Sequence, residues 1–552
     1  MRYQQHYSTR HTPQTQPIPG KKMVEMESGG FAYKVDKWTQ LDRFLILGTQ
    51  GGTYYIGERE LTVKNCDAVV ACIKEDGVRL VNRVVEVSDQ GLAPKNDPAL
   101  FVLAMASAFG DEKTRAYAFE ALDRVARIGT HLFQFCDFRE AFAGWGRGMR
   151  SAVSNWYTRK EESRLAYQLL KYKQRNGWSH RDVLRLAHPK PQNETQNALF
   201  KYTTQGIEKM EVEERQFLPN QVKAYEEVAY AHQNDQMNVE SLIQYIQRDR
   251  LTREMIPTEY LNDRNVMAAM LNDMPMHALI RNLGNLTRIG VLAPLSDNSK
   301  YVADKLVVAE AIHRSRLHPF SILAASSVYG QGHGARGRGE WTPDQQIMNA
   351  LEAAFYLSFQ NVVPSGKKIV CGIDWSGSMG GPRSYSGRYS YGGYGINGVP
   401  GMSPAYGAAA MALITNETED QVHNVVFAGT IKDISLRKGM KLSEVMELTA
   451  RGVGEGTDCA LPLRYAMSSG MPAVDAFVLY TDSQSWRGPK HVSQVIDMYR
   501  QHYSHPTKLV VVQMTSNDYS VADAQDDPLS LNVIGFDTSA PKIISDFVAG
   551  RF

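Results

Sequence analysis

The chain has little cysteine and no long hydrophobic run, and each lack excludes a class of protein. Its 552 residues include five cysteines, an odd number, and none lies in a Cys-x-x-Cys pair. This usage argues against a disulfide framework or a cysteine zinc site and favours a reducing compartment, which we take to be the cytoplasm. No run of about 18 apolar residues is present, so we expect a soluble protein with no membrane partner.

Residues 1–30 also lack the features of a signal peptide. They hold no apolar core region and no cleavage-site pattern, and they contain Gln, Thr and Pro. This composition predicts a disordered N-terminal tail.

The net charge of +2 conceals an uneven distribution. Between Trp145 and Lys190 the chain carries eleven Lys or Arg against three Asp or Glu. Such a local excess can attract a polyanion even in a near-neutral chain. An ordinary solvated helix face is the alternative interpretation of the same run.

From residue 31 to 365 the apolar residues recur at helical spacing. The clearest segments are 98–110, 114–128, 164–173, 265–274 and 344–359. A long series of amphipathic helices separated by short Gly and Pro breaks predicts an α-solenoid of HEAT type, although no strict repeat period is visible.

Residues 366–552 follow a different pattern. Short apolar strands are predicted at 368–373, 423–428, 476–481 and 508–514, with helical stretches between them. This alternation predicts a doubly wound α/β domain, with a largely parallel sheet covered on both faces. The fold class is therefore α + α/β.

A cation site is predicted at the carboxyl ends of two of these strands. Asp374, Ser376 and Ser378 follow the first strand, Thr457 lies in a Gly-rich turn, and Asp482 follows strand 476–481. Carboxylate and hydroxyl oxygens suit a divalent cation, above all Mg²⁺, and ligands bind at this edge of an α/β sheet. The order D-x-S-x-S, Thr, Asp resembles the metal-ion-dependent adhesion site of von Willebrand factor A-type domains. The alternative is that Ser376 and Ser378 only cap a helix.

A hydrolase is disfavoured at this site. Residues 376–380 read Ser-Gly-Ser-Met-Gly, so the first Gly of a nucleophile elbow is missing. The histidines at 423, 491, 502 and 505 stand in settings typical of ordinary histidines, and a metal-dependent hydrolase would need a general base that we do not find. We therefore expect a binding site rather than an enzyme. A cation-dependent protein-binding module of adhesion type, without RNA, stays open as an alternative function.

Basic side chains at helical spacing are the candidates for binding phosphates. Lys171 and Arg175 are four residues apart, which predicts one helix face, and Arg181 and Arg185 repeat the spacing on the next helix. Further candidates in the same region are Arg147, Arg150, Lys173 and His188.

Two Gly-rich stretches are predicted to be loops. Residues 380–401 hold eight Gly and four Tyr and form an insert that either contacts RNA or is passive. Residues 331–339 lack the strand and helix context of a P-loop and are expected to connect the two domains, with contact to RNA as the alternative.

Several long blocks resemble one family. They are 43–56, 171–190, 279–292, 318–334 and 456–462, and together they resemble the family of the 60-kDa Ro/SS-A ribonucleoproteins. Residues 398–414 look more like its bacterial members.

The resemblance implies a TROVE domain at 31–365, whose HEAT-like helix pairs form a monomeric ring closed by an A-type domain at 366–552. It implies small noncoding Y-like RNA on the outer surface and single-stranded 3′ ends of misfolded RNA in a central hole. It also implies a role in RNA quality control, with the exoribonuclease polynucleotide phosphorylase as a partner of bacterial members. Lys171, Arg175 and His188 match family positions implicated in Y RNA binding.

Overall fold

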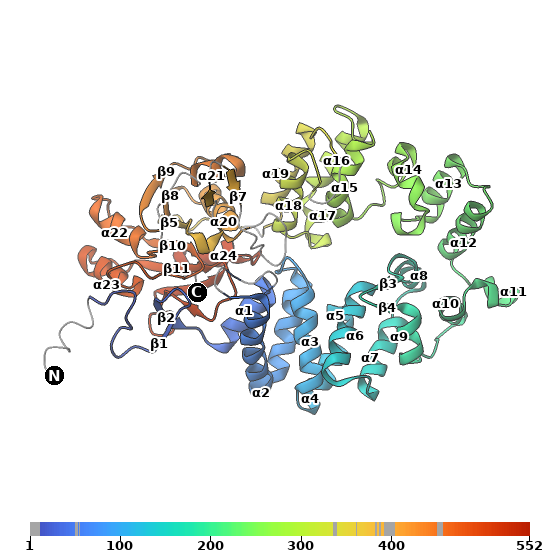
Figure 1. Cartoon of the computed structure of the whole chain (residues 1–552), viewed down its shortest axis with the longest axis horizontal. Coiled ribbons are helices and arrows are strands. Elements are labelled where there is room, and N and C mark those ends of the chain that lie inside the picture. The colour runs from blue at the N-terminus through green and yellow to red at the C-terminus, as the bar shows by residue number, and fades with distance from the viewer. Residues whose placement is uncertain are drawn as a thin grey trace.

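A computed structural model describes two architectures joined in one chain. The described residues are 11–49, 53, 56–334, 339–359, 362–380, 383–385, 388–390, 403–449 and 456–551. The first part of the chain is almost entirely helical, and from Lys368 onward helices alternate with the strands of a central sheet. We call the two parts the helical domain and the α/β domain (Figure 1).

The helical domain contains nearly every predicted helix. Its α-helices are α1 Lys37–Leu47, α2 Glu58–Gln90, α3 Asp97–Phe109, α4 Glu112–Glu120, α5 Leu122–Val125, α6 Gly129–Ala143, α7 Arg147–Thr158, α8 Glu162–Lys171, α9 His180–Ala187, α10 Glu194–Gln205, α11 Val212–Arg215, α12 Asn220–Gln233, α13 Val239–Asp249, α14 Arg264–Ala269, α15 Met276–Arg288, α16 Asp297–Leu306, α17 Ala309–Ser315, α18 Pro319–Gly330 and α19 Gln345–Leu357. The 3₁₀ turns are η1 Ile207–Lys209, η2 Arg253–Met255 and η3 Thr258–Asn262. Helix α2 is interrupted at Asp76, whose backbone is not helical.

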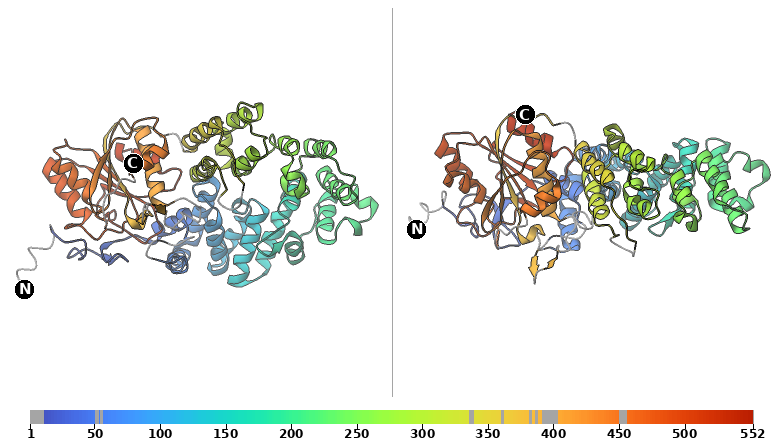
Figure 2. Two further views of the ribbon diagram at one scale, coloured as in Figure 1. Left: turned by 45° about the horizontal axis from the view of Figure 1, so that its top comes forward. Right: turned by 90° about the horizontal axis from the view of Figure 1, so that it is seen from above.

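Helices that are close in sequence pack against each other, as α2 does with α3 and α18 with α19. Figure 1 shows them following an arc that leaves the α/β domain at α2, turns near α11 and returns at α19. Seen edge-on in Figure 2, the arc is a single layer extending from that domain. The predicted helical ring is confirmed, whereas the HEAT assignment of its helix pairs stays a prediction.

The ring closes through contacts between its two ends and the α/β domain. Arg316, at the end of α17, donates from Nε to the carbonyl oxygen of Asp89 in α2 at 2.6 Å. The rings of Phe320 and Phe536 pack edge to face at 4.1 Å, and His318 Nε2 lies 2.9 Å from the carbonyl oxygen of Phe536. Helix α2 is therefore joined directly to the end of α17, and the neighbouring helix α18 contacts the α/β domain. No helix in the described ranges is long and apolar enough to span a membrane.

The α/β domain is built on a six-stranded sheet in the order β13-β11-β10-β5-β8-β9. The predicted parallel strands are all present, and β9 adds an antiparallel edge strand that the sequence pattern did not indicate. The strands are β5 Lys368–Asp374, β8 Gln421–Phe427, β9 Ile431–Ile434, β10 Ala476–Thr481, β11 Lys508–Gln513 and β13 Ser530–Ile534.

Helices cover both faces of this sheet, as a doubly wound fold requires. Side chains of β5 alternate between two hydrophobic cores. Cys371 and the residues two positions before and after it face α20 and α24, whereas Val370 faces α22 and α23. These helices are α20 Pro404–Thr418, α22 Leu461–Ser468, α23 Val492–Tyr503 and α24 Ala540–Ala549, with α21 Leu442–Thr449 packed on α20. Most of the insert at 380–401 lies outside the described residues, apart from Gly380 and the short strands β6 Arg383–Tyr385 and β7 Arg388–Ser390.

The prediction of a disordered tail over residues 1–30 is wrong for residues 11–30. Strands β1 Met23–Glu25 and β2 Phe31–Lys34 join β12 Tyr519–Ser520 in a three-stranded sheet against the α/β domain. Ile18 and Met26 are buried there, which offsets the entropy of ordering a polar segment. Residues 1–10 lie outside the described residues.

Candidate functional site

The predicted cation-site residues lie at one edge of the sheet. Parallel pairing of β5 with β10 sets Ile373 opposite Tyr480, so Asp374 and the Thr481-Asp482 pair end their strands side by side. Asp374, Ser376, Ser378, Thr457 and Asp482 are all buried, none more than 5% exposed.

Hydrogen bonds join four of the five residues directly. Asp374 Oδ1 accepts from the backbone N–H of Ser376 at 2.9 Å, and Asp374 Oδ2 accepts from Thr481 Oγ1 at 2.6 Å. The hydroxyls of Ser376 and Ser378 are 3.1 Å apart, and the Ser378 hydroxyl hydrogen-bonds the Asp482 carboxylate.

Thr457 is held beside this group through its backbone. Its carbonyl oxygen accepts hydrogen bonds of 3.0 Å from the backbone N–H groups of Trp486 and Arg487, on the loop that follows Asp482. The next residue, Asp458, donates from its backbone to the carbonyl oxygen of Ala428, just beyond β8. The Thr457 loop and the Asp482 loop are therefore packed together.

The electrostatics of the site favour a cation. Burial raises the pKa of Asp374 to about 6, and burial together with the charge of Asp374 raises the pKa of Asp482 to about 7. Neither carboxylate has a Lys, Arg or His within ion-pair distance among the described residues. Burying two charged carboxylates without a counter-charge costs free energy, and a bound divalent cation would lower that cost.

The donor set fits Mg²⁺. It combines two carboxylates with serine and threonine hydroxyls, which are hard oxygen donors, and Mg²⁺ uses few carboxylates and retains water ligands. In the described part of the chain no cluster of three or more His, Cys, Asp or Glu side chains is arranged to hold a metal. A cation here would therefore depend on the hydroxyls of Ser376, Ser378 and Thr457.

The histidines of this domain are engaged away from the two serines. His491 Nε2 lies 2.8 Å from the carbonyl oxygen of Gln16, His423 pairs with Asp433 at 2.5 Å, and His505 Nδ1 contacts Thr507 at 2.9 Å. None of these contacts gives Ser376 or Ser378 a base.

Four of the basic candidates lie on two neighbouring helices of the helical domain. Arg147 and Arg150 lie on the first turn of α7, Arg181 and Arg185 on α9, and both pairs are exposed. Helix α9 packs on α7, and its spacing places Arg181 and Arg185 one turn apart as predicted.

The prediction that Lys171 and Arg175 share a helix face is wrong. Helix α8 ends at Lys171, and Arg175 lies in a hairpin of β3 Gln174–Arg175 and β4 Trp178–Ser179. The turn residues Asn176 and Gly177 have φ of 52° and 76°, the left-handed pair that a type I′ turn requires. The Asn-Gly dipeptide is a strong hairpin signal, and it overrides the helical spacing.

Tyrosines rather than carboxylates contact the lysines of this region. Lys171 Nζ donates to the hydroxyl of Tyr167 at 2.7 Å, and the Lys173 ammonium lies 3.9 Å from the ring centroid of Tyr225. Arg175 is exposed and donates to the carbonyl oxygen of Gln174. Within the described ranges none of the three has an acidic partner, whereas Lys160 and Arg159 are paired with Asp123.

We use the name "basic surface" for a group of exposed or half-exposed cations of this region, each without an acidic partner among the described residues. They are Arg147, Arg150, Lys171, Lys173, Arg175, Arg181 and Arg185, together with His188, which caps α9 in the left-handed conformation.

Comparisons with known proteins agree with this two-part organisation. The TROVE domain family matches residues 24–367, and the Ro60 vWA domain family matches residues 368–548. The chain belongs to the Ro family.

Two relatives match over nearly the whole chain. The chain is 36% identical to "RNA-binding protein RO60" of Deinococcus radiodurans over 98% of this chain and 97% of that protein. It is 31% identical to "RNA-binding protein RO60" of Caenorhabditis elegans, covering 96% and 90% of the two chains. The crystal structure of Deinococcus radiodurans RO (RSR) protein matches with a TM-score of 0.68 at 35% identity, over 94% of this chain and all of that one.

Sequence reasoning missed two features of this Ro-family chain that bear on its sites. Tyr225, beside Lys173, comes from α12 and is 52 positions away, so no local pattern points to it. The N-terminal segment contacts the loops of the cation site from more than 400 positions away, and its polar composition gave no sign of burial.

Proposed function

We propose that this Ro-family chain binds RNA and that its basic surface holds the phosphates. The observation that carries the proposal is a set of exposed or half-exposed cations without acidic partners among the described residues, which includes Lys171, Lys173 and Arg175. Cations that are not neutralised within the protein are free to neutralise phosphates and release their counterions. The relatives in two organisms are named as RNA-binding proteins, which supports the proposal.

The resemblance to the Ro family supports two modes of binding. We propose that a small structured noncoding RNA of the Y type binds the outer surface through α7, α9 and the 174–179 hairpin. Single-stranded 3′ ends of misfolded RNA would enter the centre of the ring. A ring that admits one strand but not a duplex selects RNAs by shape and by a free end, without reading a base sequence.

We further propose that the edge formed by Asp374, Ser376, Ser378, Thr457 and Asp482 binds Mg²⁺, leaving room for water or an acidic partner group. On this proposal the protein is a cytoplasmic ribonucleoprotein scaffold for RNA quality control rather than an enzyme. An exoribonuclease of the polynucleotide phosphorylase type would be its partner. The support is the buried oxygen cluster, the absence of a nearby base among the described residues, and the family resemblance.

Gel-shift titration with a structured small RNA tests the RNA-binding proposal. The double variant Lys171→Ala/Arg175→Ala should bind more weakly, and the slope of log affinity against log salt should become shallower by about 2, since two phosphate contacts are lost. Arg124→Ala is the matched control, because Arg124 is exposed but paired with Asp89 at 2.6 Å.

Unchanged affinity in the double variant would remove the basic surface from the proposal. If the purified protein carried no RNA and instead captured a protein partner that EDTA released, the adhesion-type alternative would be favoured.

A further inference from the structure

Residues 12–30, which we call the N-terminal strap, cross the α/β domain at the edge that carries the candidate cation site. The backbone N–H of Thr12 donates to Gln494 Oε1 at 3.1 Å, and the backbone N–H of Gln14 donates to the carbonyl oxygen of Gly488 at 3.1 Å. Further along, the backbone N–H of Ser28 donates to Gln484 Oε1 at 3.2 Å. The strap is thus bonded at both of its ends to the segment that follows Asp482.

Gln14 bridges the two loops that supply Thr457 and Asp482. Its side chain is buried, with 1% of the residue exposed. Nε2 donates to Asp458 Oδ1 and to the carbonyl oxygen of Lys490, each at 2.9 Å, and Oε1 accepts from Ser485 Oγ at 2.5 Å. Ser485 Oγ in turn accepts from the backbone N–H of Cys459 at 2.9 Å. The side-chain amide of Gln14, together with its partner Ser485, therefore links residues 458–459 to residues 485–490.

Two glycines allow the strap to come this close. A Cβ at Gly30 would lie 2.2 Å from the carbonyl oxygen of Ser485. A Cβ at Gly488 would lie 2.4 Å from Gln14 Nε2 and 2.5 Å from Asp458 Oδ1. Both contacts are closer than side chains tolerate, so the sequence has glycine on each side of the junction where the strap meets the loops.

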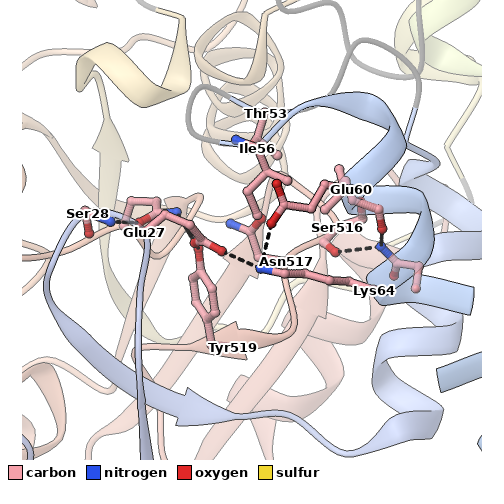
Figure 3. Close-up of polar contacts among 12 residues, drawn as sticks. Glu27, Ser28, Thr53, Ile56, Glu60, Lys64, Ser516, Asn517 and Tyr519 are labelled. Atoms are coloured by element: carbon pink, nitrogen blue, oxygen red, sulfur yellow. Dashed lines mark hydrogen bonds and ion pairs between the residues drawn. The ribbon is translucent and has the colours of Figure 1, made fainter. Parts of the chain in front are cut away.

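A second link reaches Asp482 itself. The backbone N–H of Gln484 donates to Asp482 Oδ1 at 3.1 Å, and Gln484 Nε2 donates to Glu27 Oε2 of the strap at 3.0 Å. Glu27 also accepts from Tyr519 and, at 2.9 Å, from Lys64 Nζ of helix α2 (Figure 3). The backbone N–H that hydrogen-bonds Asp482 Oδ1 therefore belongs to Gln484, and the side chain of Gln484 is bonded to the strap.

We propose that the N-terminal strap is a positioning element for the cation site, with Gln14 and Gln484 as its positioning residues. The inference rests on the proposed cation-binding function of Asp374, Ser376, Ser378, Thr457 and Asp482. Gln14 holds the Thr457 loop against the Asp482 loop, and Gln484 orients the Asp482 carboxylate. Groups that orient metal ligands in this way govern affinity even though they do not touch the metal.

Isothermal titration of the full-length protein with Mg²⁺ tests the role of the strap. Gln14→Ala and Gln484→Met should each weaken Mg²⁺ binding by about 10-fold or more, as loss of a group that orients metal ligands typically does. Lys21→Ala is the matched control on the same strap, since Lys21 pairs with Asp523 at 2.7 Å and Asp526 at 2.9 Å instead of the cation-site loops. It should retain wild-type affinity. Melting temperatures without Mg²⁺ identify any variant that is unfolded at the titration temperature.

The possible results separate this inference from the function on which it rests. Wild-type affinity in both Gln14→Ala and Gln484→Met would overturn the role of the strap and leave the cation site standing. Equal weakening in Lys21→Ala would also overturn it, because the strap would then act only through general stability. If the wild-type protein bound no Mg²⁺, the cation site and the inference would fall together.

Discussion

Asp374 and Asp482 are the two carboxylates of the candidate cation site, and both are buried. Burial raises the pKa of Asp374 from an ordinary value of 3.8 to about 6, and burial together with the charge of Asp374 raises the pKa of Asp482 from 3.8 to about 7. The folded protein thus holds these protons more tightly than the unfolded chain does. The contribution of this pair to the stability of the folded protein is fully present at pH values below the ordinary pKa. It is lost as the pH rises through about 6 to 7.

A pH-dependent effect of Mg²⁺ follows from these pKa values. The cation must displace the protons, so it should raise the melting temperature strongly at about pH 8 and weakly at about pH 5. At a Mg²⁺ concentration about 100 times Kd, the stabilisation would be about 2.7 kcal/mol. Thermal unfolding with Mg²⁺ and with EDTA at both pH values measures the difference.

Asp374→Asn is the control for that measurement. It should abolish the Mg²⁺ effect at both pH values and raise the melting temperature of the cation-free protein at the higher pH, because one of two repelling charges is gone. A Mg²⁺ effect of equal size at both pH values would place the ion elsewhere in the protein.

The β3–β4 hairpin determines where Arg175 lies, and its turn depends on Asn176 and Gly177 in the left-handed conformation. Asn176→Ala puts a residue with no local hydrogen-bonding side chain into that conformation, at a cost of about 1 kcal/mol. We expect a several-fold loss of RNA affinity in gel shifts, because Arg175 is displaced from its place beside Lys173.

Asp235→Ala is the matched control for the hairpin. Asp235 also has a positive φ, of 54°, but it lies between α12 and α13 and is not one of the residues of the basic surface. It should show a similar loss of stability with wild-type RNA affinity. If the two variants bound RNA equally well, the hairpin would have no part in RNA binding.

How much of the site could be predicted from sequence depended on how local its signals are. Asp374 ends a buried strand, Ser376 and Ser378 follow it within four positions, and parallel pairing brings Asp482 to the same edge, so the strand pattern predicts that these four residues lie together. The prediction that Lys171 and Arg175 share a helix face is wrong because the turn at Asn176-Gly177 places Arg175 in a hairpin strand beyond the end of α8. Gln14 could not have been predicted as a bridge, since Asp458 is 444 positions away and only the fold brings them together.

The ring as a whole is closed by contacts that no local sequence pattern specifies. Residues near the start of the helical domain, such as Asp89, meet Arg316 near its end, and both ends also rest on the α/β domain. Arg43, fully buried in α1, donates to the carbonyl oxygens of Asn517 and Tyr519 at 2.6 and 2.7 Å. At the other end, Phe320 and His318 contact Phe536. The α/β domain therefore fastens both ends of the arc, which would keep the centre of the ring at one size.

Phe536→Ala tests whether that closure is a single cooperative structure. Phe536 is 1% exposed, and truncating a buried Phe costs about 3 to 5 kcal/mol. If the closure can open locally, amide hydrogen exchange should become faster in α17, in α18 and at the end of α2, while the central sheet stays protected. Phe109→Ala is the control, because that ring is 51% exposed and lies on α3. Faster exchange over the whole molecule would instead show that the two domains unfold as one unit.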